Sequence, residues 1–218
     1  QQRKLEKTKA LKSAYLAEMF PSEGERVPKR RFEGFTDEWE VRKLVDIAPL
    51  RGGFAFKSSE FKEEGIPIIR ISNILSNGSV GGDFVFYQEQ ENDADYLLPD
   101  KAAVIAMSGA TTGKVSIIDN PDNQKIYQNQ RVGYFRKKQN VDYSFISTLV
   151  TSRLFTDQLK SVLVAGAQPN ISANEIDSFE FLIPTQIDEQ NKIGNFFKQI
   201  DKVIANNQRK LDKLKALK

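Results

Sequence analysis

The segment 127–131, Tyr-Gln-Asn-Gln-Arg, places side-chain amides next to a guanidinium within a stretch rich in strand-forming residues. Amide side chains can form two hydrogen bonds with adenine, and arginine can bind guanine or a phosphate. Side chains alternate along a strand, so Gln128 and Gln130 are predicted to lie opposite Asn129 and Arg131. This pattern predicts a nucleic-acid-binding surface. A partly buried polar strand that satisfies its own neighbouring loops is the competing interpretation.

Three further polar or basic clusters lie near predicted strand ends. They are Arg51, Lys57 and Ser58; Arg70, Ser72 and Asn73; and Gln168 with Asn170. Such side chains can contact phosphates or base edges. We expect them to contribute to the same nucleic-acid-binding surface as the first segment.

The loop 108–115, SGATTGKV, has the composition of a phosphate-binding loop but not its spacing. Three residues rather than four separate its glycines, and Val115 follows Lys114 where that loop requires Ser or Thr. Nucleotide hydrolysis is therefore not expected. The glycine N–H groups, the hydroxyls of Thr111 and Thr112 and the Lys114 ammonium still suit a nucleic-acid phosphate. An ordinary hairpin turn is the alternative.

The sequence predicts no catalysis by this chain. It has no Cys and no His, which removes thiolate metal ligands and the commonest general base. The segment 120–122, Asn-Pro-Asp, lacks the second proline and the aromatic residue of the amino-methyltransferase signature. We expect neither a cofactor nor a metal.

Charge is distributed unevenly along the 218 residues, although the formal net charge is only +3. Residues 1–20 carry five basic and two acidic groups, and residues 186–218 carry eight and four, so the middle is mildly acidic. Nucleic-acid binding there requires a local basic patch. No apolar run approaches the roughly 20 residues of a membrane span, and we expect a cytoplasmic protein.

The middle of the chain reads as an α+β domain of short twisted strands with packed helices. Short β-branched or aromatic runs between turn residues predict strands at 66–72, 83–87, 102–107, 114–119, 126–136 and 179–183. Between the predicted strands 126–136 and 179–183, apolar residues at helical spacing predict one helix over 143–164.

The C-terminal segment 186–218 is predicted to form one long helix with an apolar seam. Apolar residues recur along this segment at heptad-like spacing, and Leu5 near the N-terminus occupies the position that matches Leu211. The predicted coiled-coil interface is therefore Leu5, Ile193, Phe197, Ile200, Ile204, Leu211 and Leu214. Asn207 interrupts the seam, where it either sets the register or faces solvent.

The two ends of the chain repeat each other. Residues 2–12 and 208–218 are identical at nine of eleven positions, so we expect about one period of a longer tandem duplication. Two such helices are predicted to pack as an antiparallel coiled coil. A single helix lying on the surface of its own domain is the alternative.

An ordered set of motifs resembles the specificity subunit of bacterial type I restriction–modification systems. The set begins with Trp39 and LVDI at 44–47. It continues with GGFAFKS at 52–58, IPIIRISNI at 66–74, GATTGK at 109–114 and NQR at 129–131. It ends with GAQPNIS at 166–172 and Ile183-Pro184 before the long helix. Each motif alone is weak, whereas their order is specific.

The resemblance implies a domain organisation. Residues 1–20 correspond to the end of a central conserved helix, 21–40 to a linker, 41–184 to a DNA target-recognition domain and 185–218 to a conserved coiled-coil helix. The chain would thus represent the C-terminal half of such a subunit.

The resemblance also implies a function and partners. The domain would recognise one half of a split site in double-stranded DNA. Its partners would be modification (methyltransferase) subunits, a restriction subunit, and the other half of the specificity subunit or a second copy in a homodimer. A coiled-coil adaptor that binds protein rather than DNA is the alternative function.

Overall fold

The computed structural model describes residues 1–165 and 170–216, which divide into two compact units. Unit 1 comprises Gln1–Arg42, Gln139–Thr148 and Glu180–Lys218, and unit 2 comprises Lys43–Lys138 and Leu149–Phe179. Within the described ranges, no helix has both the length and the apolar character needed to cross a membrane.

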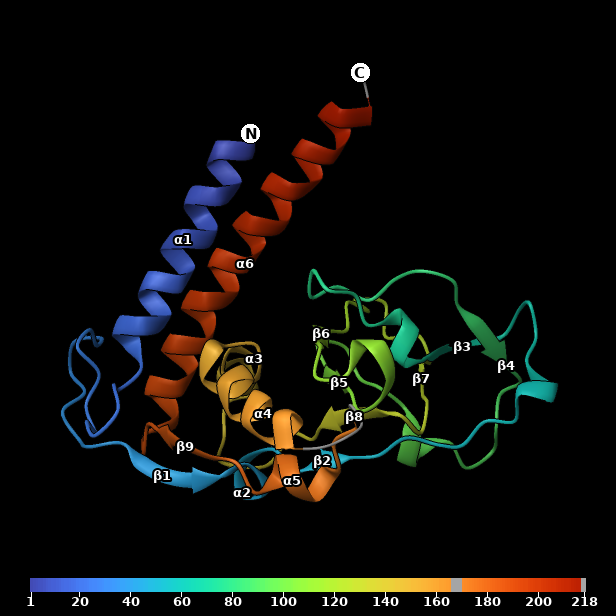
Figure 1. Cartoon of the computed structure of the whole chain (residues 1–218), viewed down its shortest axis with the longest axis horizontal. Helices are drawn as coiled ribbons and strands as arrows, with labels where there is room; N and C mark the ends of the chain where they lie inside the picture. Colours follow the sequence, from blue (N-terminus) through green and yellow to red (C-terminus); the bar gives the residue numbers. More distant parts are fainter. Residues whose placement is uncertain (166–169, 217–218) are drawn as a thin grey trace. The chain divides into compact units, whose positions relative to one another are not determined.

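Two long helices of unit 1, α1 (Gln2–Met19) and α6 (Ile187–Ala216), lie side by side and run in opposite directions (Figure 1). Near their middle, Lys12 Nζ lies 2.6 Å from Asp201 Oδ1. One helical turn further along α1, the rings of Tyr15 and Phe196 meet edge to face, with centroids 5.0 Å apart. The predicted antiparallel arrangement of the two helices is confirmed.

Burial along the seam of α6 decreases toward its C-terminus. Ile193 and Phe197 are buried, and so is Leu5 of α1. Ile200, Ile204 and Leu211 are half-buried. Leu214 is 49% exposed, because the Lys12–Asp201 register carries the end of α6 past the first turn of α1. The register therefore decides which predicted seam residues are covered within this chain.

Asn207 lies inside the seam rather than in solvent. The residue is 6% exposed, and its amide nitrogen has no hydrogen-bond partner among the described residues. A single buried amide in an apolar helix interface penalises other registers more than it stabilises the correct one. Of the two predicted roles, the burial supports setting the register.

An aromatic cluster forms the core of unit 1 beneath these helices. Trp39 is completely buried and meets Phe20 and Phe145 edge to face. Phe145 belongs to α3 (Tyr143–Val150) and also stacks on Phe20. The short strands β1 (Glu40–Lys43) and β9 (Glu180–Ile183) pair with each other.

The N-terminal linker is fastened to α6 by a buried ion pair. Arg31 donates two hydrogen bonds to the carboxylate of Glu189, at 2.7 and 2.8 Å, and only 1% of the Glu189 side chain is exposed. These bonds raise the pKa of Arg31 although burial opposes the shift. Glu189 lies in the first turn of α6, where the helix dipole also favours negative charge.

The described residues of unit 2 form two sheets (Figure 1). The larger is antiparallel with strand order β2-β8-β5-β6, formed by β2 (Leu50–Arg51), β8 (Val132–Phe135), β5 (Ala103–Ala106) and β6 (Val115–Ile117). The smaller has order β4-β3-β7, formed by β4 (Val85–Tyr87), β3 (Ile66–Ile69) and β7 (Tyr127–Gln128), and its β3–β7 pairing is parallel.

Three helices of unit 2 accompany the sheets: α2 (Leu44–Ile47), α4 (Arg153–Ala165) and α5 (Ala173–Asp177). Phe155 of α4 meets Phe135 of β8 edge to face, at a ring separation of 5.6 Å. Asp177 of α5 accepts a hydrogen bond from the Leu50 amide of β2. Short 3-10 turns occupy Ser58–Glu60, Ile71–Asn73, Ala94–Tyr96 and Gly109–Thr111.

The α+β class is confirmed, whereas two predicted elements are each divided in two. The predicted strand 126–136 is broken by a turn, so that β7 and β8 belong to different sheets. The predicted helix 143–164 is two helices, α3 and α4. Between them, the buried Ser152 hydroxyl bonds the Leu149 carbonyl and the Ser152 carbonyl accepts the Thr156 amide.

Candidate functional site

Several strand ends of unit 2 meet at one edge. Because β3 and β7 are parallel, with Ile69 paired to Gln128, the residues that follow them, Arg70 and Asn129, emerge at the same edge. Strand β5 is antiparallel to β8, and Ala106 pairs with Val132. The loop after β5 therefore begins beside the segment 129–131.

Hydrogen bonds join a fourth segment to this edge. The Met107 amide donates to the Arg131 carbonyl at 2.9 Å, and the Ile171 amide donates to the Met107 carbonyl at 3.0 Å. We call the combined surface of Arg70 and residues 107–114, 129–131 and 170–172 the recognition edge. It brings together candidates that lie up to 100 positions apart in the sequence.

A tight turn forms one exposed part of the recognition edge. The Val132 amide donates to the Asn129 carbonyl at 2.9 Å, which closes a turn with Gln130 and Arg131 at its tip. Both tip residues are exposed, and Asn129 is half-buried. An open hollow of about 400 Å³ lies beside the tip. Its lining residues are Met107, Gln130, Arg131, Asn170, Ile171, Ser172 and Glu175.

A buried polar network holds the base of this turn. Arg51 donates two hydrogen bonds to the side-chain oxygen of Gln128, at 3.0 and 2.7 Å. The Gln128 amide nitrogen donates to the main-chain carbonyls of Arg51 and Val132, at 2.8 and 2.7 Å. The Arg51 guanidinium also donates to the Leu97 carbonyl and lies 4.9 Å from the Tyr134 ring centroid.

The predicted DNA contacts of Gln128 and Arg51 do not match this geometry. Gln128 is completely buried, and both atoms of its amide are bonded within the protein. Burial lowers the pKa of Arg51 below its ordinary value, yet a guanidinium stays charged. These two side chains fix the position of the turn instead of presenting themselves to a ligand.

The cluster that follows β3 also separates into internal and exposed members. Asn73 is completely buried; its oxygen accepts the Arg70 amide, and its nitrogen donates to the carbonyls of Gly81 and Asp83. The predicted DNA contact of Asn73 therefore does not match its position, because the amide shapes the 70–83 loop. Arg70 is half-buried and donates to the Asp83 carbonyl, whereas Ser72 is exposed.

The glycine-containing loop is a compact turn. Thr112, Gly113 and Lys114 donate their amides to carbonyls within the β5–β6 connection and at the end of β5. The hydroxyls of Thr111 and Thr112 donate to the carbonyls of Ile71 and Gly109. The expectation of a free N–H group is thus wrong for Gly113, because the turn uses its amide. Lys114 is half-buried, and its ammonium donates to Ser76.

The remaining candidates lie in different places. Lys57 and Ser58 are exposed in a turn where Lys57 forms an ion pair with Glu60. Glu60 in turn accepts a hydrogen bond from Tyr87, and Tyr87 pairs with Ile66, the first residue of β3. Lys57 and Ser58 therefore lie near the end of β3 that is opposite the recognition edge. Asn170 is exposed beside the hollow. Gln168 lies outside the described residues.

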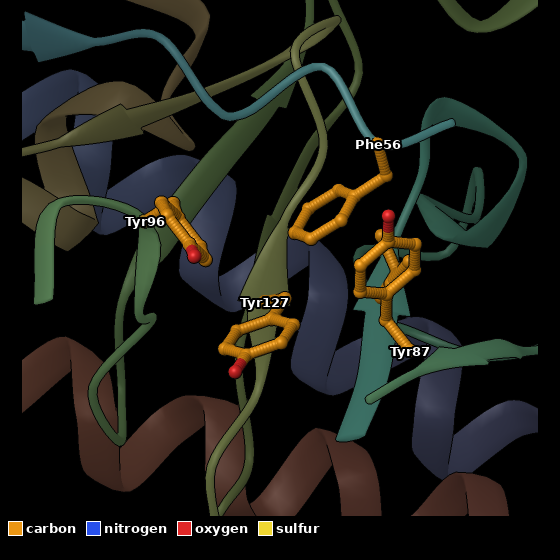
Figure 2. Close-up of a cluster of buried hydrophobic side chains, with 5 residues drawn as sticks. Phe56, Tyr87, Tyr96 and Tyr127 are labelled. Atoms are coloured by element: carbon orange, nitrogen blue, oxygen red, sulfur yellow. The ribbon is translucent and has the colours of Figure 1, made fainter. Parts of the chain in front are cut away.

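An aromatic cluster in unit 2 was not predicted from the sequence. Phe56, Ile68, Tyr87, Tyr96 and Tyr127 pack together (Figure 2). A partial signal was the alternate spacing of Phe54 and Phe56, which places both side chains on one face of an extended segment. Their packing near Tyr127 depends on a contact between segments that are distant in the sequence.

Polar groups hold one corner of this aromatic cluster. The Tyr127 hydroxyl accepts the Gln90 amide and donates to Asp93. Lys125 bonds the same carboxylate at 2.7 Å and holds the pKa of Asp93 below its usual range. The rings are therefore fixed in place as well as packed.

The fold and sequence match known specificity proteins. The family model for the type I restriction modification DNA specificity domain matches residues 36–216. The type I restriction enzyme MjaVIII specificity subunit of Methanocaldococcus jannaschii is 28% identical over 175 residues, which cover 77% of this chain and 40% of that protein. The EcoBI specificity subunit of Escherichia coli is 24% identical over 159 residues, which cover 65% and 32%.

Solved structures agree with this result at the level of the fold. The type I restriction–modification S subunit of M. genitalium superposes with a TM-score of 0.69 at 17% identity, covering 98% of this chain and 52% of that one. The HsdS subunit of Thermoanaerobacter tengcongensis gives a TM-score of 0.62 at 15% identity, covering 94% and 46%. The chain spans less than half the length of the two named sequence relatives. Since the family model matches most of its residues, the chain belongs to the type I restriction–modification DNA specificity family.

Proposed function

We propose that unit 2 recognises one half of a split site in double-stranded DNA as part of the specificity subunit of a type I restriction–modification complex. The observation that carries the proposal is the exposed tip Gln130–Arg131 at an edge where four separate segments converge. An amide and a guanidinium side by side can read adenine and guanine edges in the major groove.

Other polar groups at or next to the edge would bind phosphates or neighbouring bases. We assign this role to Asn129, Asn170, Ser72, Arg70 and Lys114, none of which is fully buried. Thr111 and Thr112 would support the loop that carries Lys114, since their hydroxyls already donate to main-chain carbonyls. Binding that depends on phosphate contacts weakens steeply as salt concentration rises.

The proposal includes the predicted domain organisation and partners. Residues 41–184 would form the recognition domain, and the helices within 1–20 and 185–218 would set the distance to the other half of the subunit. Methyltransferase and restriction subunits would supply the chemistry in the cytoplasm, with this chain positioning them without catalysis of its own.

A domain exchange tests the proposal. The full-length specificity subunit, assembled with its modification subunits in cells, would carry residues 41–184 either unchanged or replaced by those of a relative. Methylome sequencing is expected to show a split adenine-methylated motif in which the exchange alters one half only. A motif that ignores the exchange, in an active complex, would contradict DNA recognition by this domain.

A further inference from the structure

Phe54 is a large apolar side chain that remains 45% exposed directly beside the turn 129–132. We propose that Phe54 contacts DNA, inserting its ring at a base step next to the half-site and stacking on a base. This inference rests on the proposed DNA recognition and adds an aromatic contact to it.

The main chain fixes Phe54 to the recognition turn. The Phe54 amide donates to the Gln128 carbonyl at 2.9 Å, and Phe54 forms a parallel bridge with Asn129. The preceding residue must be glycine, because a Cβ on Gly53 would lie 2.2 Å from the Asn129 carbonyl oxygen. Phe54 therefore lies at a fixed position next to Asn129, the first residue of the turn.

Packed rings support Phe54 from behind. Its ring centroid lies 4.9 Å from that of Phe56 and 4.8 Å from that of Tyr96. Phe56 in turn stacks on Tyr127 at 5.4 Å with nearly parallel planes (18°). Figure 2 shows Phe56, Tyr96 and Tyr127 grouped in this way. A ring held against such a platform loses little conformational freedom when it contacts a ligand.

The chemistry of an exposed, supported ring differs from that of the amides around it. Stacking of a base on an aromatic ring contributes about 1–3 kcal/mol and tolerates any base. Apolar side chains inserted at a base step bend the duplex, and flexible pyrimidine–purine steps accept this most easily. Phe54 would thus respond to how easily a step deforms, while Gln130 and Arg131 read base edges.

Phe84 provides a matched control. It is also an exposed phenylalanine of unit 2, with 37% of its surface accessible. It precedes β4, and the pairing of Val85 with Ile68 puts it opposite Ile69, at the same end of the sheet as Arg70 but on the far side of β3 from β7 and the turn 129–132. If any exposed phenylalanine affected binding through general hydrophobicity, Phe84 would behave like Phe54.

The test uses the full specificity subunit assembled with its modification subunits. Phe54→Ala, Phe54→Leu, Phe54→Trp and Phe84→Ala would be compared for affinity to the duplex carrying the methylated motif and for thermal unfolding. Phe54→Ala and Phe54→Leu are expected to weaken binding by about 5- to 150-fold, the equivalent of about 1–3 kcal/mol. Phe54→Trp and Phe84→Ala are expected to bind like the unchanged protein.

A fluorescent duplex adds a direct reading of base contact. 2-Aminopurine placed beside the half-site is expected to show a fluorescence change on binding that Phe54→Ala removes. Unchanged affinity and fluorescence for both Phe54→Ala and Phe54→Leu would overturn the proposal, as would equal losses for Phe84→Ala. If the unchanged complex does not prefer its motif over a scrambled duplex, the proposed function itself fails; if it does, only the role of Phe54 is in question.

Discussion

Arg51 and the side-chain amide of Gln128, 77 positions apart in the sequence, each donate a hydrogen bond to the other residue. Arg51 donates to the Gln128 oxygen, and the Gln128 nitrogen returns a 2.8 Å bond to the Arg51 carbonyl. A second bond from that nitrogen reaches Val132, on the far side of the turn. This pair sets the position of the exposed residues Gln130 and Arg131.

Replacing Gln128 with Ala is expected to lower both stability and sequence discrimination. The change removes the hydrogen bonds of the Gln128 side chain to the Arg51 guanidinium and to the Arg51 and Val132 carbonyls, at a cost of about 1–3 kcal/mol in the free energy of unfolding. The ratio of affinities for cognate and scrambled duplexes should also fall in protein that remains folded.

Gln130→Ala is the matched control for this prediction. Gln130 is exposed, so its removal should leave the urea unfolding midpoint unchanged while reducing discrimination. A purely structural role of Gln128 would instead reduce cognate and scrambled binding by the same factor, in proportion to the unfolded fraction.

Breaking the Arg31–Glu189 pair is expected to destabilise unit 1. Either Arg31→Ala or Glu189→Ala leaves one buried charge unpaired, which costs about 3–5 kcal/mol. Arg30→Ala removes a comparable pair with Glu18 whose side chains are about half exposed, and should change stability very little. Chemical unfolding would measure all three, and equal effects at positions 30 and 31 would show that burial of the pair contributes nothing.

Gly194→Ala is expected to separate α6 from α3. A Cβ at this position would lie 2.1 Å from Ser144 Oγ and 2.5 Å from the Phe145 amide nitrogen, and overpacking of this kind costs about 1–3 kcal/mol. Helix propensity alone predicts the opposite sign, a gain of about 1 kcal/mol. A lower unfolding midpoint would show that overpacking outweighs helix propensity, and a higher midpoint would show the reverse. Gly52→Ala is the control, because a Cβ at position 52 would have no atom within 4 Å.

Asp142 makes the stability of unit 1 dependent on pH. Burial alone would raise the pKa of Asp142, but hydrogen bonds from Ser144, Asn191 and the Phe145 amide outweigh it and hold that pKa below its ordinary value. A carboxyl whose pKa is lower in the folded state stabilises that state fully above the unfolded pKa of about 3.9, and loses this contribution as pH falls through the folded pKa.

The variant Asp142→Asn tests this linkage, because it can still cap α3 but does not titrate. The unchanged protein is expected to be more stable than the variant near neutral pH, and the difference should shrink below about pH 4. Urea unfolding over this range would measure the difference. A constant difference would mean that the charge on Asp142 contributes nothing.

The sequence predicted the fold class better than the roles of individual polar side chains. Periodicity identified most strands and the long helix, since burial of one face leaves a regular pattern. It could not reveal the break after Gln128, because at that point the chain leaves one sheet for another and packs against Gly53 of a distant segment. For the same reason, Gln128 and Asn73 looked like surface donors: an amide that bonds distant carbonyls has no sequence pattern of its own.

The recognition edge itself was partly predictable. The candidates were chosen for their position near strand ends, and the parallel β3–β7 pairing brings Arg70 and Asn129 to the same edge. The position of Lys57 was not predictable in this way. It lies near the opposite end of β3 because Tyr87 pairs with Ile66, and the order of motifs along the chain does not specify that pairing.

Methylome sequencing of cells that express the assembled complex with Gln130→Ala and Arg131→Ala together tests whether the recognition edge reads a half-site, with Lys57→Ala as the exposed control. The double change is expected to relax or abolish one half of the split motif and to leave the other half intact, while Lys57→Ala leaves both halves unchanged. An active complex that methylates the same complete motif after the double change would contradict recognition by this edge.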